Sequence, residues 1–360
     1  MSVFEHEAFR DHERVVFCRE PEVGLRAIIA IHDTTLGPAA GGCRMWPYGS
    51  SEEALTDVLR LAQAMSYKNA LAGLALGGGK SVIIADARCA KTPALLHAFA
   101  RAVEELGGRY YTAEDIGIGM ADVETLGEVT RYVFGHSREG GSGDPSPFTA
   151  RGGFEGIRAA VRHRLGRDDL EGLGVALQGV GNVGYALAAL LSSAGARLIV
   201  ADTERANRER AQKEFGAKAV EASVIHSQDA DVFAPCAMGA VLNDATIPEI
   251  KAPIVAGVAN NQLAEERHGR ALRDRGILYA PDYVVNAGGM LSGARDILQD
   301  YGVDEVNRRI DGIYDTVLEI FRRSEKEGLA PNEVADALAR EKLAREKLAS
   351  EKIMGARKGT

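Results

Sequence analysis

The hydrophobic positions of the first 110 residues alternate between a strand pattern and a helix pattern. Residues 22–35, EVGLRAIIAIHDTT, carry apolar side chains at every second position, which predicts a strand with one buried face. Residues 50–73 follow the i, i+3, i+4, i+7 spacing of an amphipathic helix, and Ser50 or Ser51 is a suitable N-cap. The helix spacing runs through Leu55, Val58, Leu59, Ala62 and Met65, and three residues later it reaches Lys68.

Glycine-rich stretches separate the elements expected in this part of the chain. Residues 37–45, GPAAGGCRM, are expected to form a loop, and the glycines at 77–79 a turn before a strand at 81–85. An Ala- and Leu-rich helix is expected from about 93 to 106. Residues 109–126, RYYTAEDIGIGMADVETL, then predict a strand, an acidic loop and a helix.

The composition changes at residues 135–153, GHSREGGSGDPSPFTARGG, which are rich in Gly, Ser and Pro, as linkers are. Beyond this segment, short apolar runs alternate with helical stretches. This alternation predicts a parallel, doubly wound sheet. The apolar runs are GVALQGVGNVG, ARLIVAD, ADVFAPC, APIVAGVANN and GILYAPDYVVNAGG.

The end of the chain contains a five-residue repeat between 339 and 353, with the units AREKL, AREKL and ASEKI. Five residues advance an α-helix by about 140°. The apolar residues Leu343, Leu348 and Ile353 therefore do not share one face. The repeat predicts a charged helix with a solvated end, not a coiled coil.

The overall composition excludes several classes of protein. There are 43 Lys and Arg residues against 51 Asp and Glu, a net charge of −8, which argues against nucleic-acid binding. No apolar run approaches the roughly 18–20 residues of a membrane helix. The N-terminus, MSVFEHEAFRDHERVVFCRE, lacks the apolar core of a signal peptide. We therefore expect a cytoplasmic protein with neither nucleic acid nor membrane as partner.

Cysteine and histidine usage agrees with this expectation. The four cysteines contain no C-x-x-C pair and are expected to be reduced thiols, most of them small core residues. The eight histidines show neither an H-x-x-x-H pattern nor a His/Cys cluster, so no metal site is expected. The cysteines are Cys18, Cys43, Cys89 and Cys236.

The stretch LAGLALGGGKSVIIAD, residues 71–86, resembles a phosphate-binding P-loop but departs from its spacing. With Gly79, Lys80 and Ser81 in the G-K-[ST] positions, the first glycine should stand at 74, which is Leu74. A strand is also expected after Lys80, whereas a P-loop lysine opens a helix. Lys80 therefore needs another role.

The second part contains a G-x-G-x-x-G motif between an expected strand and an expected helix, and Asp202 ends the next strand. The glycines permit a tight turn, and the helix N-terminus attracts a pyrophosphate. Asp202 can accept hydrogen bonds from a ribose 2′-OH and would repel a 2′-phosphate. The order of these pieces predicts a site for NAD rather than NADP, although Arg205 lies nearby. The glycines are Gly179, Gly181 and Gly184.

Two lysines in the first part are candidates for chemistry. Lys68 and Lys80 flank the glycine run in an apolar region, and Glu114 and Asp115 follow an expected strand. A lysine removed from water near another cation can act as a base or polarise a carbonyl. A lone lysine is usually a surface residue with a buried stem, but two of them beside one glycine run favour a functional role.

Seven motifs, in order along the chain, resemble those of the Glu/Leu/Phe/Val (amino-acid) dehydrogenase family, and most closely those of its leucine enzymes. The similarity spans roughly Val16 to Ala337. The motifs are IHDTTLGPAAGGCRMW, MSYKNALAGLALGGGKSVI, YTAEDIG, ALQGVGNVG, DVFAPCAMGAVLN, AGVANNQL and GILYAPDYVVNAGG.

The resemblance implies an α/β chain of two domains with a cleft between them. Residues 1–145 would form the substrate-binding, catalytic and oligomerisation domain around a mixed sheet, and 146–330 an NAD-binding Rossmann domain. Residues 331–360 would form a helical tail that returns to the first domain. A homo-oligomer, octamer or dimer, is also implied.

The resemblance further assigns roles to single residues. Lys80 would polarise the oxygen on the α-carbon and activate water, Asp115 would carry a proton to and from the amino nitrogen, and Lys68 would pair with the α-carboxylate. Asn261, with Asn260 as a rival register, would lie near that carboxylate and the nicotinamide. The other implied substrate-binding residues are Gly41, Gly42, Met65, Ala40, Ala113, Met290 and Gly293. The implied cofactor-binding residues are Gly179, Gly181, Asn182, Val183, Gly184, Asp202, Thr149, Ala237 and Asn260.

The implied reaction is the reversible oxidative deamination of an apolar L-amino acid of the leucine, valine or isoleucine type. The Cα hydride passes to NAD, water adds to the imine, and ammonia and a 2-oxo acid leave. Ala40 stands where the leucine enzymes have a leucine, and Gly293 where they have a valine. A wider pocket would favour phenylalanine or another bulky aromatic, although Met290 and Leu291 could refill the space.

Other functions are set aside on the residues present. An NAD-binding regulator without catalysis would have lost Lys68, Lys80 or Asp115, and an amine dehydrogenase would have lost Lys68 or Asn261, but all are present. A malic-enzyme-like or hydroxy-acid dehydrogenase would need a metal triad or a His/Arg pair, and neither spacing occurs.

Overall fold

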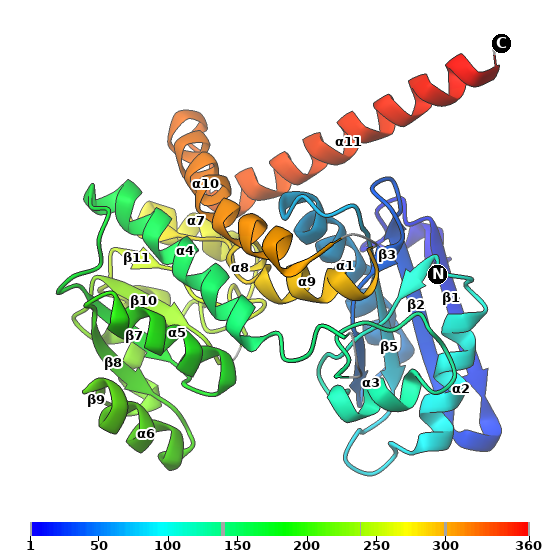
Figure 1. Ribbon diagram of the computed structural model, residues 1–360, viewed down its shortest axis with the longest axis horizontal. Helices are drawn as coiled ribbons and strands as arrows, with labels where there is room; N and C mark the ends of the chain where they lie inside the picture. The colour runs from blue at the N-terminus through cyan, green and yellow to red at the C-terminus, as the bar shows by residue number, and fades with distance from the viewer. Residues whose placement is uncertain (1, 138–140, 238, 299–300, 359–360) are drawn as a thin grey trace. The chain divides into compact units, whose positions relative to one another are not determined.

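The computed structural model describes residues 2–137, 141–237, 239–298 and 301–358. These residues form two compact units, each with its own sheet (Figure 1). Unit 1 consists of Met1–Asp144, Ser292–Gly302 and Ala339–Thr360. Unit 2 consists of Pro145–Leu291 and Val303–Leu338. Neither unit is therefore one continuous stretch of chain.

The sheet of unit 1 is mixed, as predicted, and has the order β1-β2-β5-β3-β6, with β4 also paired to β5. Its strands are β1 (Arg14–Glu20), β2 (Leu25–Asp33), β3 (Ala39–Ala40), β4 (Cys43–Trp46), β5 (Gly77–Ile84) and β6 (Tyr110–Tyr111). The pairs β1–β2 and β2–β5 are antiparallel, whereas β3 and β4 run parallel to β5, and β6 runs parallel to β3.

Helices cover both faces of this sheet. They are α1 (Ser51–Leu71), α2 (Pro93–Glu104) and α3 (Met120–Leu126), with 3-10 turns η1 (Val3–Glu5), η2 (Pro21–Val23) and η5 (Ala294–Asp296). The predicted helix is confirmed in α1, and Ser50 caps it by accepting a hydrogen bond from the Glu53 N–H. Ile28 and Ala30 pack with α1, and Ile29 and Ile31 with α2. Strand β2 is therefore buried on both faces, whereas the alternation of apolar residues predicts only one buried face.

Two of the predicted loops are wrong. Residues 37–45 contain β3 and β4, and the glycines at 77–79 lie within β5 rather than in a turn. The reason is close packing, because a Cβ on Gly78 would lie 2.1 Å from the backbone N of Ser66 in α1. Without side chains at these positions, α1 lies directly on the strand.

The sheet of unit 2 is fully parallel, which confirms the doubly wound prediction. Its strands are β7 (Gly174–Gln178), β8 (Arg197–Ala201), β9 (Lys218–Ala219), β10 (Val232–Pro235), β11 (Ile254–Val255) and β12 (Leu278–Tyr279). The order is β12-β11-β10-β7-β8-β9. The winding direction reverses between β7 and β10, and ligands of such sheets bind at the carboxyl ends of the strands at this point.

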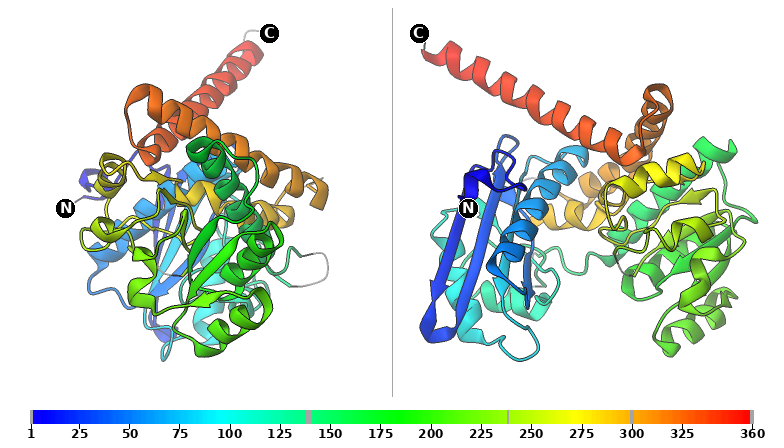
Figure 2. Two further views of the ribbon diagram at one scale, coloured as in Figure 1. Left: turned by 90° about the vertical axis from the view of Figure 1, so that its left-hand side faces the viewer. Right: turned by 180° about the vertical axis from the view of Figure 1, so that it is seen from behind.

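The helices of unit 2 flank this sheet (Figure 2). They are α4 (Ser146–Leu165), α5 (Asn182–Ser193), α6 (Arg205–Phe215), α7 (Arg267–Asp274), α8 (Asp282–Val285) and α10 (Val303–Glu327), with turns η3 (Ala222–Ser227) and η4 (Ile247–Glu249). The short helix α9 (Gly288–Gly293) crosses the boundary between the units at Leu291. Helix α4 packs against α5 and α10. The linker predicted at 135–153 is therefore too long, because α4 begins inside it.

The terminal helix α11 (Pro331–Lys358) confirms the interpretation of the repeat. Leu343 is only 8% exposed whereas Leu348, one repeat later, is 59% exposed, so the two residues lie on different faces. Ile353 has no described side chain. Among the helices that the structure describes, none is both long and apolar enough to cross a membrane.

The cysteine prediction was partly wrong. All four are free thiols, but only Cys43 is fully buried, while Cys18 and Cys236 are half-buried and Cys89 is exposed.

Candidate active site

The centre of the candidate site in unit 1 is an ion pair between Lys80 and Asp115. The Nζ of Lys80 lies 3.2 Å from Oδ2 of Asp115, and Lys80 is 6% exposed. Strand β5 carries Lys80, and Asp115 lies in the loop after β6, where its backbone N–H and C=O pair with Ile118. The two residues singled out in the sequence are thus brought together in a place with little access to water.

Glycine 42 allows this meeting. A Cβ there would lie 2.1 Å from the Glu114 carbonyl oxygen and 3.1 Å from the Asp115 Cβ. The Cys43 N–H donates to the Ala113 carbonyl at 2.9 Å, which fixes the same two segments side by side. The role expected for Gly42 in substrate binding stays a prediction, but its lack of a side chain is required for the geometry of Asp115.

A residue that sequence reasoning missed completes the cluster. The Arg44 Nε–H donates to Asp115 Oδ2 at 2.9 Å, and its terminal NH group donates to Asp57 Oδ2 on α1 at 3.0 Å. The Tyr48 hydroxyl also donates to Asp57, at 2.5 Å. The signal was present, because Arg44 follows two residues after Gly42 in GGCRM, but only the register of β4 beside β5 shows where it lies.

The electrostatics of the cluster favour an ionised Asp115. Burial by itself would raise the pKa of this carboxyl, but Lys80 and Arg44 together outweigh burial and hold the pKa below its ordinary value. For the neighbouring Glu114, burial and the charges of Asp144 and Asp115 raise the pKa. Adjacent acidic residues therefore differ in proton affinity, a pattern that is common where acids and bases act.

The other expected substrate residues of unit 1 lie on α1, on and after β3, and in the loop after β6. Lys68 is half-buried in the last turn of α1, and Met65 lies one turn earlier, with its Cγ 3.0 Å from the position of a Gly41 Cβ. The backbone of Gly41 is already hydrogen-bonded to β6. Its N–H donates to the Tyr111 carbonyl, and its carbonyl oxygen accepts a hydrogen bond from the Tyr110 hydroxyl. Ala40 is fully buried in β3, and Ala113 is 5% exposed.

Gly293, which was expected to widen the substrate pocket, does not lie beside empty space. A Cβ there would lie 2.9 Å from the ring of Phe134. Phe134 is 6% exposed, and its backbone N–H donates to the Thr112 carbonyl. The aromatic ring therefore occupies the volume that a larger residue at 293 would fill.

The glycine motif of unit 2 lies where β7 ends and α5 begins. Gly179 has a φ of +95°, and a Cβ there would lie 2.6 Å from the Cβ of Ala237. Gly181 is the N-cap of α5, Asn182 and Val183 form its first turn, and Gly184 packs on the Gly179 carbonyl. The turn thus leaves the helix N-terminus accessible, a suitable place for a pyrophosphate.

Asp202 lies at the carboxyl end of β8, next to this turn. Its Oδ2 accepts the Val180 N–H at 2.8 Å, and its Oδ1 accepts the Glu204 N–H at 2.8 Å. A carboxylate has about four acceptor positions, so both oxygens keep a lone pair for a ribose hydroxyl. Asp202 therefore also supports the glycine turn, a role that the motif alone does not reveal.

The remaining expected residues of unit 2 gather after β10 and β11 and at α4. Asn260 accepts a hydrogen bond at 2.8 Å from Asn286, a 3%-exposed residue that sequence reasoning missed. Asn261 is exposed and has a left-handed φ of +52°. Thr149 lies against Gly289, one residue before the buried Met290. Whether these residues bind substrate or cofactor stays a prediction.

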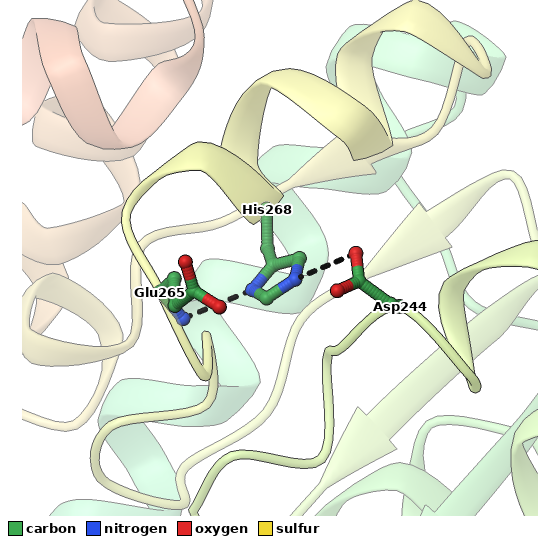
Figure 3. Close-up of side chains that lie close together, drawn as sticks. All are labelled: Asp244, Glu265 and His268. Atoms are coloured by element: carbon green, nitrogen blue, oxygen red, sulfur yellow. Dashed lines mark hydrogen bonds and ion pairs between the residues drawn. The ribbon is translucent and has the colours of Figure 1, made fainter.

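A second cluster in unit 2 has donor types that suit a metal ion. The imidazole of His268 lies between Glu265 and Asp244 (Figure 3). Its Nδ1 accepts the Glu265 N–H at 2.9 Å, and its Nε2 lies 3.3 Å from Asp244 Oδ1. Arg267 donates hydrogen bonds to both carboxylates. Arg267 supplies the positive charge of this cluster, and its hydrogen bonds link the first residue of α7 to Glu265 and Asp244.

Comparisons with known proteins extend this picture. The family profile of the Glu/Leu/Phe/Val dehydrogenase dimerisation domain matches residues 12–136, and that of Glutamate/Leucine/Phenylalanine/Valine dehydrogenase matches residues 199–350. The leucine dehydrogenases of Bacillus cereus and Geobacillus stearothermophilus are each 50% identical over 343 residues, covering 95% of this chain and 93% of those proteins.

A solved structure agrees with the sequence relatives. The L-tryptophan dehydrogenase of Nostoc punctiforme superposes with a TM-score of 0.82 at 43% identity, and the match covers 94% of this chain and 97% of that one. Fold, motifs and relatives agree along nearly the whole length of the chain. The chain therefore belongs to the Glu/Leu/Phe/Val dehydrogenase family of amino-acid dehydrogenases.

Proposed function

We propose that this enzyme catalyses the NAD-dependent, reversible oxidative deamination of a branched-chain L-amino acid, with leucine as the preferred type. The observation that carries the proposal is the buried Lys80–Asp115 pair, which places a cation and an ionised carboxylate together in a site with little water. The leucine dehydrogenase relatives at 50% identity support the substrate class.

In the proposed mechanism the two residues divide the work. Asp115 begins ionised and takes a proton from the substrate ammonium, so that the nitrogen lone pair can form the imine as the Cα hydride is lost; a bound nicotinamide would supply the hydride acceptor. The Lys80 ammonium orients water for addition to the imine carbon and stabilises the resulting oxygen, and the proton that the water loses passes to solvent. Asp115 returns its proton to the amino nitrogen of the carbinolamine, and loss of the hydroxyl proton then expels ammonia and gives the 2-oxo acid. Lys68 pairs with the substrate carboxylate.

The family uses a nicotinamide cofactor, which supplies the hydride acceptor. We assign NAD because the residues of unit 2 fit it. The accessible N-terminus of α5 suits the pyrophosphate, and Asp202, with free lone pairs at the end of β8, suits an unphosphorylated ribose. A 2′-phosphate would meet the negative charge of Asp202.

A second candidate, an enzyme for phenylalanine or a bulkier aromatic, is favoured by the small residues Ala40 and Gly293. Phe134 fills the space beside Gly293, which favours the aliphatic substrate. A methylene in an apolar pocket contributes only about 1–3 kcal/mol of discrimination, so activity on several apolar amino acids is expected.

The test is the formation of NADH at alkaline pH with L-leucine, L-valine, L-phenylalanine, L-tryptophan and L-glutamate, with NADP in a parallel series. We expect the highest kcat/KM for leucine or valine and a strong preference for NAD. Dominance of an aromatic substrate would replace the first candidate by the second. If none of the five amino acids gives NADH although the protein binds NADH, the protein is a binding protein without catalysis.

We also propose a homo-oligomer, either a dimer or an octamer. Strand β1 is an edge strand, and Phe17 on it is 58% exposed. An unpaired edge with an exposed aromatic residue is suited to association with a second copy. Light scattering on the eluted protein measures the number of subunits, and a monomer would contradict the proposal.

A further inference from the structure

The neighbours of Asp115 leave one charged group without a role in the reaction. Lys80 is assigned to the substrate oxygen and Lys68 to the substrate carboxylate, but Arg44 bonds the same Asp115 oxygen as Lys80 does. Its side chain is only 14% exposed, and its second contact, to Asp57 on α1, anchors it from the opposite side. An arginine shared by two carboxylates in a fixed fork has little freedom to move.

We propose that Arg44 is a positioning residue of the reaction, which holds the Asp115 carboxylate ionised and aimed at Lys80 and is itself held by Asp57. The inference rests on the proposed function of Asp115. It adds a chain of contacts from α1 through Arg44 to the reacting groups, in which Asp57 and Tyr48 never touch the substrate.

The charges around Asp115 show why a second cation is needed. The titratable groups that face it are Lys80 on β5, Arg44 and Cys43 on β4, Tyr48 before α1, Tyr110 on β6 and the adjacent Glu114. Burial raises the pKa of the Cys43 thiol to about 12 and raises that of the Tyr110 hydroxyl, so both stay neutral. Burial also opposes the ionisation of Asp115, and the two cations act against it.

In the free enzyme Asp115 has to be ionised before it can take the proton of the substrate ammonium. In this state Lys80 and Arg44 both bond the same oxygen of its carboxylate. Without Arg44 the carboxylate would have one cation instead of two, and its proton affinity would rise. The low-pH limb of kcat/KM, which reports an essential base of the free enzyme, would move to higher pH.

The outer side of Arg44 offers a direct test. Arg44 and Asp57 line a hollow of about 370 Å³ together with Trp46, Tyr48, Glu53 and Ile116. A guanidinium ion can therefore reach the space that Arg44→Ala would leave. Urea has nearly the same size and shape but no charge, so it is the matched control for rescue.

The experiment compares the full-length wild type with Arg44→Ala, Arg44→Gln, Arg44→Lys and Asp57→Asn, using NADH formation from L-leucine. For Arg44→Gln we expect kcat to fall by on the order of 100-fold and the acid limb to move up by about one pH unit or more. KM for leucine should change little, because Arg44 does not contact the substrate. Arg44→Lys should recover part of both effects, and Asp57→Asn should show them in weaker form.

Rescue separates positioning from simple loss of structure. Millimolar guanidinium should raise kcat of Arg44→Ala by about tenfold or more, whereas urea at the same concentration should not. Thr130→Val is the control variant, because the buried Thr130 hydroxyl donates to Glu104 at 2.6 Å in the same unit but does not contact Asp115 or the turn that carries it. We expect Thr130→Val to lower the Tm and leave the acid limb in place.

Each remaining outcome identifies which proposal fails. If the wild type oxidises leucine and Arg44→Gln lowers only the Tm, with an unchanged acid limb and no guanidinium rescue, the role of Arg44 is wrong and the proposed function stands. If the wild type oxidises no amino acid although it binds NADH, the proposed function fails, and the role of Arg44 with it. Should Arg44→Gln fail to fold, Arg44→Lys and Asp57→Asn provide the same comparison.

Discussion

Phe134 and Gly293 illustrate how one residue can compensate for another. The ring of Phe134 lies where a side chain at position 293 would be. A smaller residue at one position and a larger one at the other conserve volume, the kind of exchange that packed interiors tolerate best. We therefore expect the two positions to set the size of the pocket together.

The prediction is that Phe134→Ala raises kcat/KM for phenylalanine relative to leucine by about tenfold or more. Stability should fall by about 3–5 kcal/mol because a buried ring is lost, and the ratio of two substrates on one enzyme removes this effect. Gly293→Val alone should clash with the ring. Phe134→Ala combined with Gly293→Val should return the ratio toward leucine, and additive effects of the two changes would contradict the pairing.

His12 is a residue whose neutral form the fold requires. It is 6% exposed, its Nε2–H donates to the Leu59 carbonyl at 2.9 Å, and its Nδ1 accepts the Arg10 N–H. The ring of His32 lies 4.9 Å away, edge to face. Burial lowers the pKa of His12 from 6.5 to about 4, against the opposing hydrogen bond to Leu59.

The consequence is a loss of stability in acid. Between pH 6.5 and about 4 the unfolded chain binds a proton at His12 that the folded chain does not. The free energy of unfolding therefore decreases as the pH is lowered through this range, by up to about 1.4 kcal/mol per pH unit. Urea denaturation of wild type and His12→Gln across this range measures the difference. We expect a shallower slope for the variant than for the wild type, and equal slopes would contradict this role of His12.

At the scale of elements, β5 shows what the glycine run does. A Cβ on Gly78 would meet the backbone of α1 at 2.1 Å, and a helix backbone cannot move aside as a side chain can. We predict that Gly78→Ala costs about 3 kcal/mol or more, since overpacking a rigid contact forces backbone shifts. Gly312→Ala in α10, with no atom within 4 Å, should stabilise the protein by up to about 1 kcal/mol. Thermal unfolding compares the two, and equal effects would exclude the close-packing role.

The repeat in α11 provides a second test at the scale of elements, because two leucines in it have the same preceding residues in sequence. Leu343 and Leu348 end identical AREKL units but differ in exposure, 8% against 59%. Leu343→Ala should cost about 2–5 kcal/mol as a buried residue, and Leu348→Ala less than about 0.5 kcal/mol as a surface residue. Urea denaturation measures both. A similar loss from Leu348→Ala would indicate that a second subunit covers it.

At the scale of the whole molecule, segments distant in sequence complete unit 1. Asp296, from the short return segment, accepts hydrogen bonds from the Gly135 N–H at 2.7 Å and the Ser142 hydroxyl at 2.9 Å. These partners are 161 and 154 residues away along the chain. Residues 1–144 alone would lack this acceptor.

We predict that Asp296→Ala lowers stability by about 1–3 kcal/mol because buried donors lose their acceptor. Asp296→Asn keeps one acceptor oxygen and should lose less. Asp168→Ala, which removes an exposed pair with Arg162, is the control and should change stability by less than about 0.5 kcal/mol. Chemical denaturation followed by circular dichroism checks all three, and an Asp296→Ala variant as stable as the control would contradict the role of this link.

The sequence by itself determined the features that depend on neighbours along the chain. The period of α1, the presence of strand β2, the glycine motif before α5 and the parallel sheet of unit 2 follow from local spacing, because the repeat of apolar residues and the turn residues between them are set along the chain. The candidate residues Lys80, Asp115 and Asp202 also stood out, since unusual side chains beside glycine turns or strand ends are visible in a linear pattern.

Only the tertiary structure decided which residues from different segments are in contact. The glycines at 77–79 form a strand because α1 lies against them, Arg44 reaches Asp115 because β4 pairs with β5 in one register, and Phe134 fills the space beside Gly293. These contacts join residues that are 12 (Ser66 and Gly78), 71 (Arg44 and Asp115) and 159 (Phe134 and Gly293) positions apart, and no local pattern encodes which of them meet. Local periodicity therefore fixes the elements, and the close approach of their backbones fixes the site.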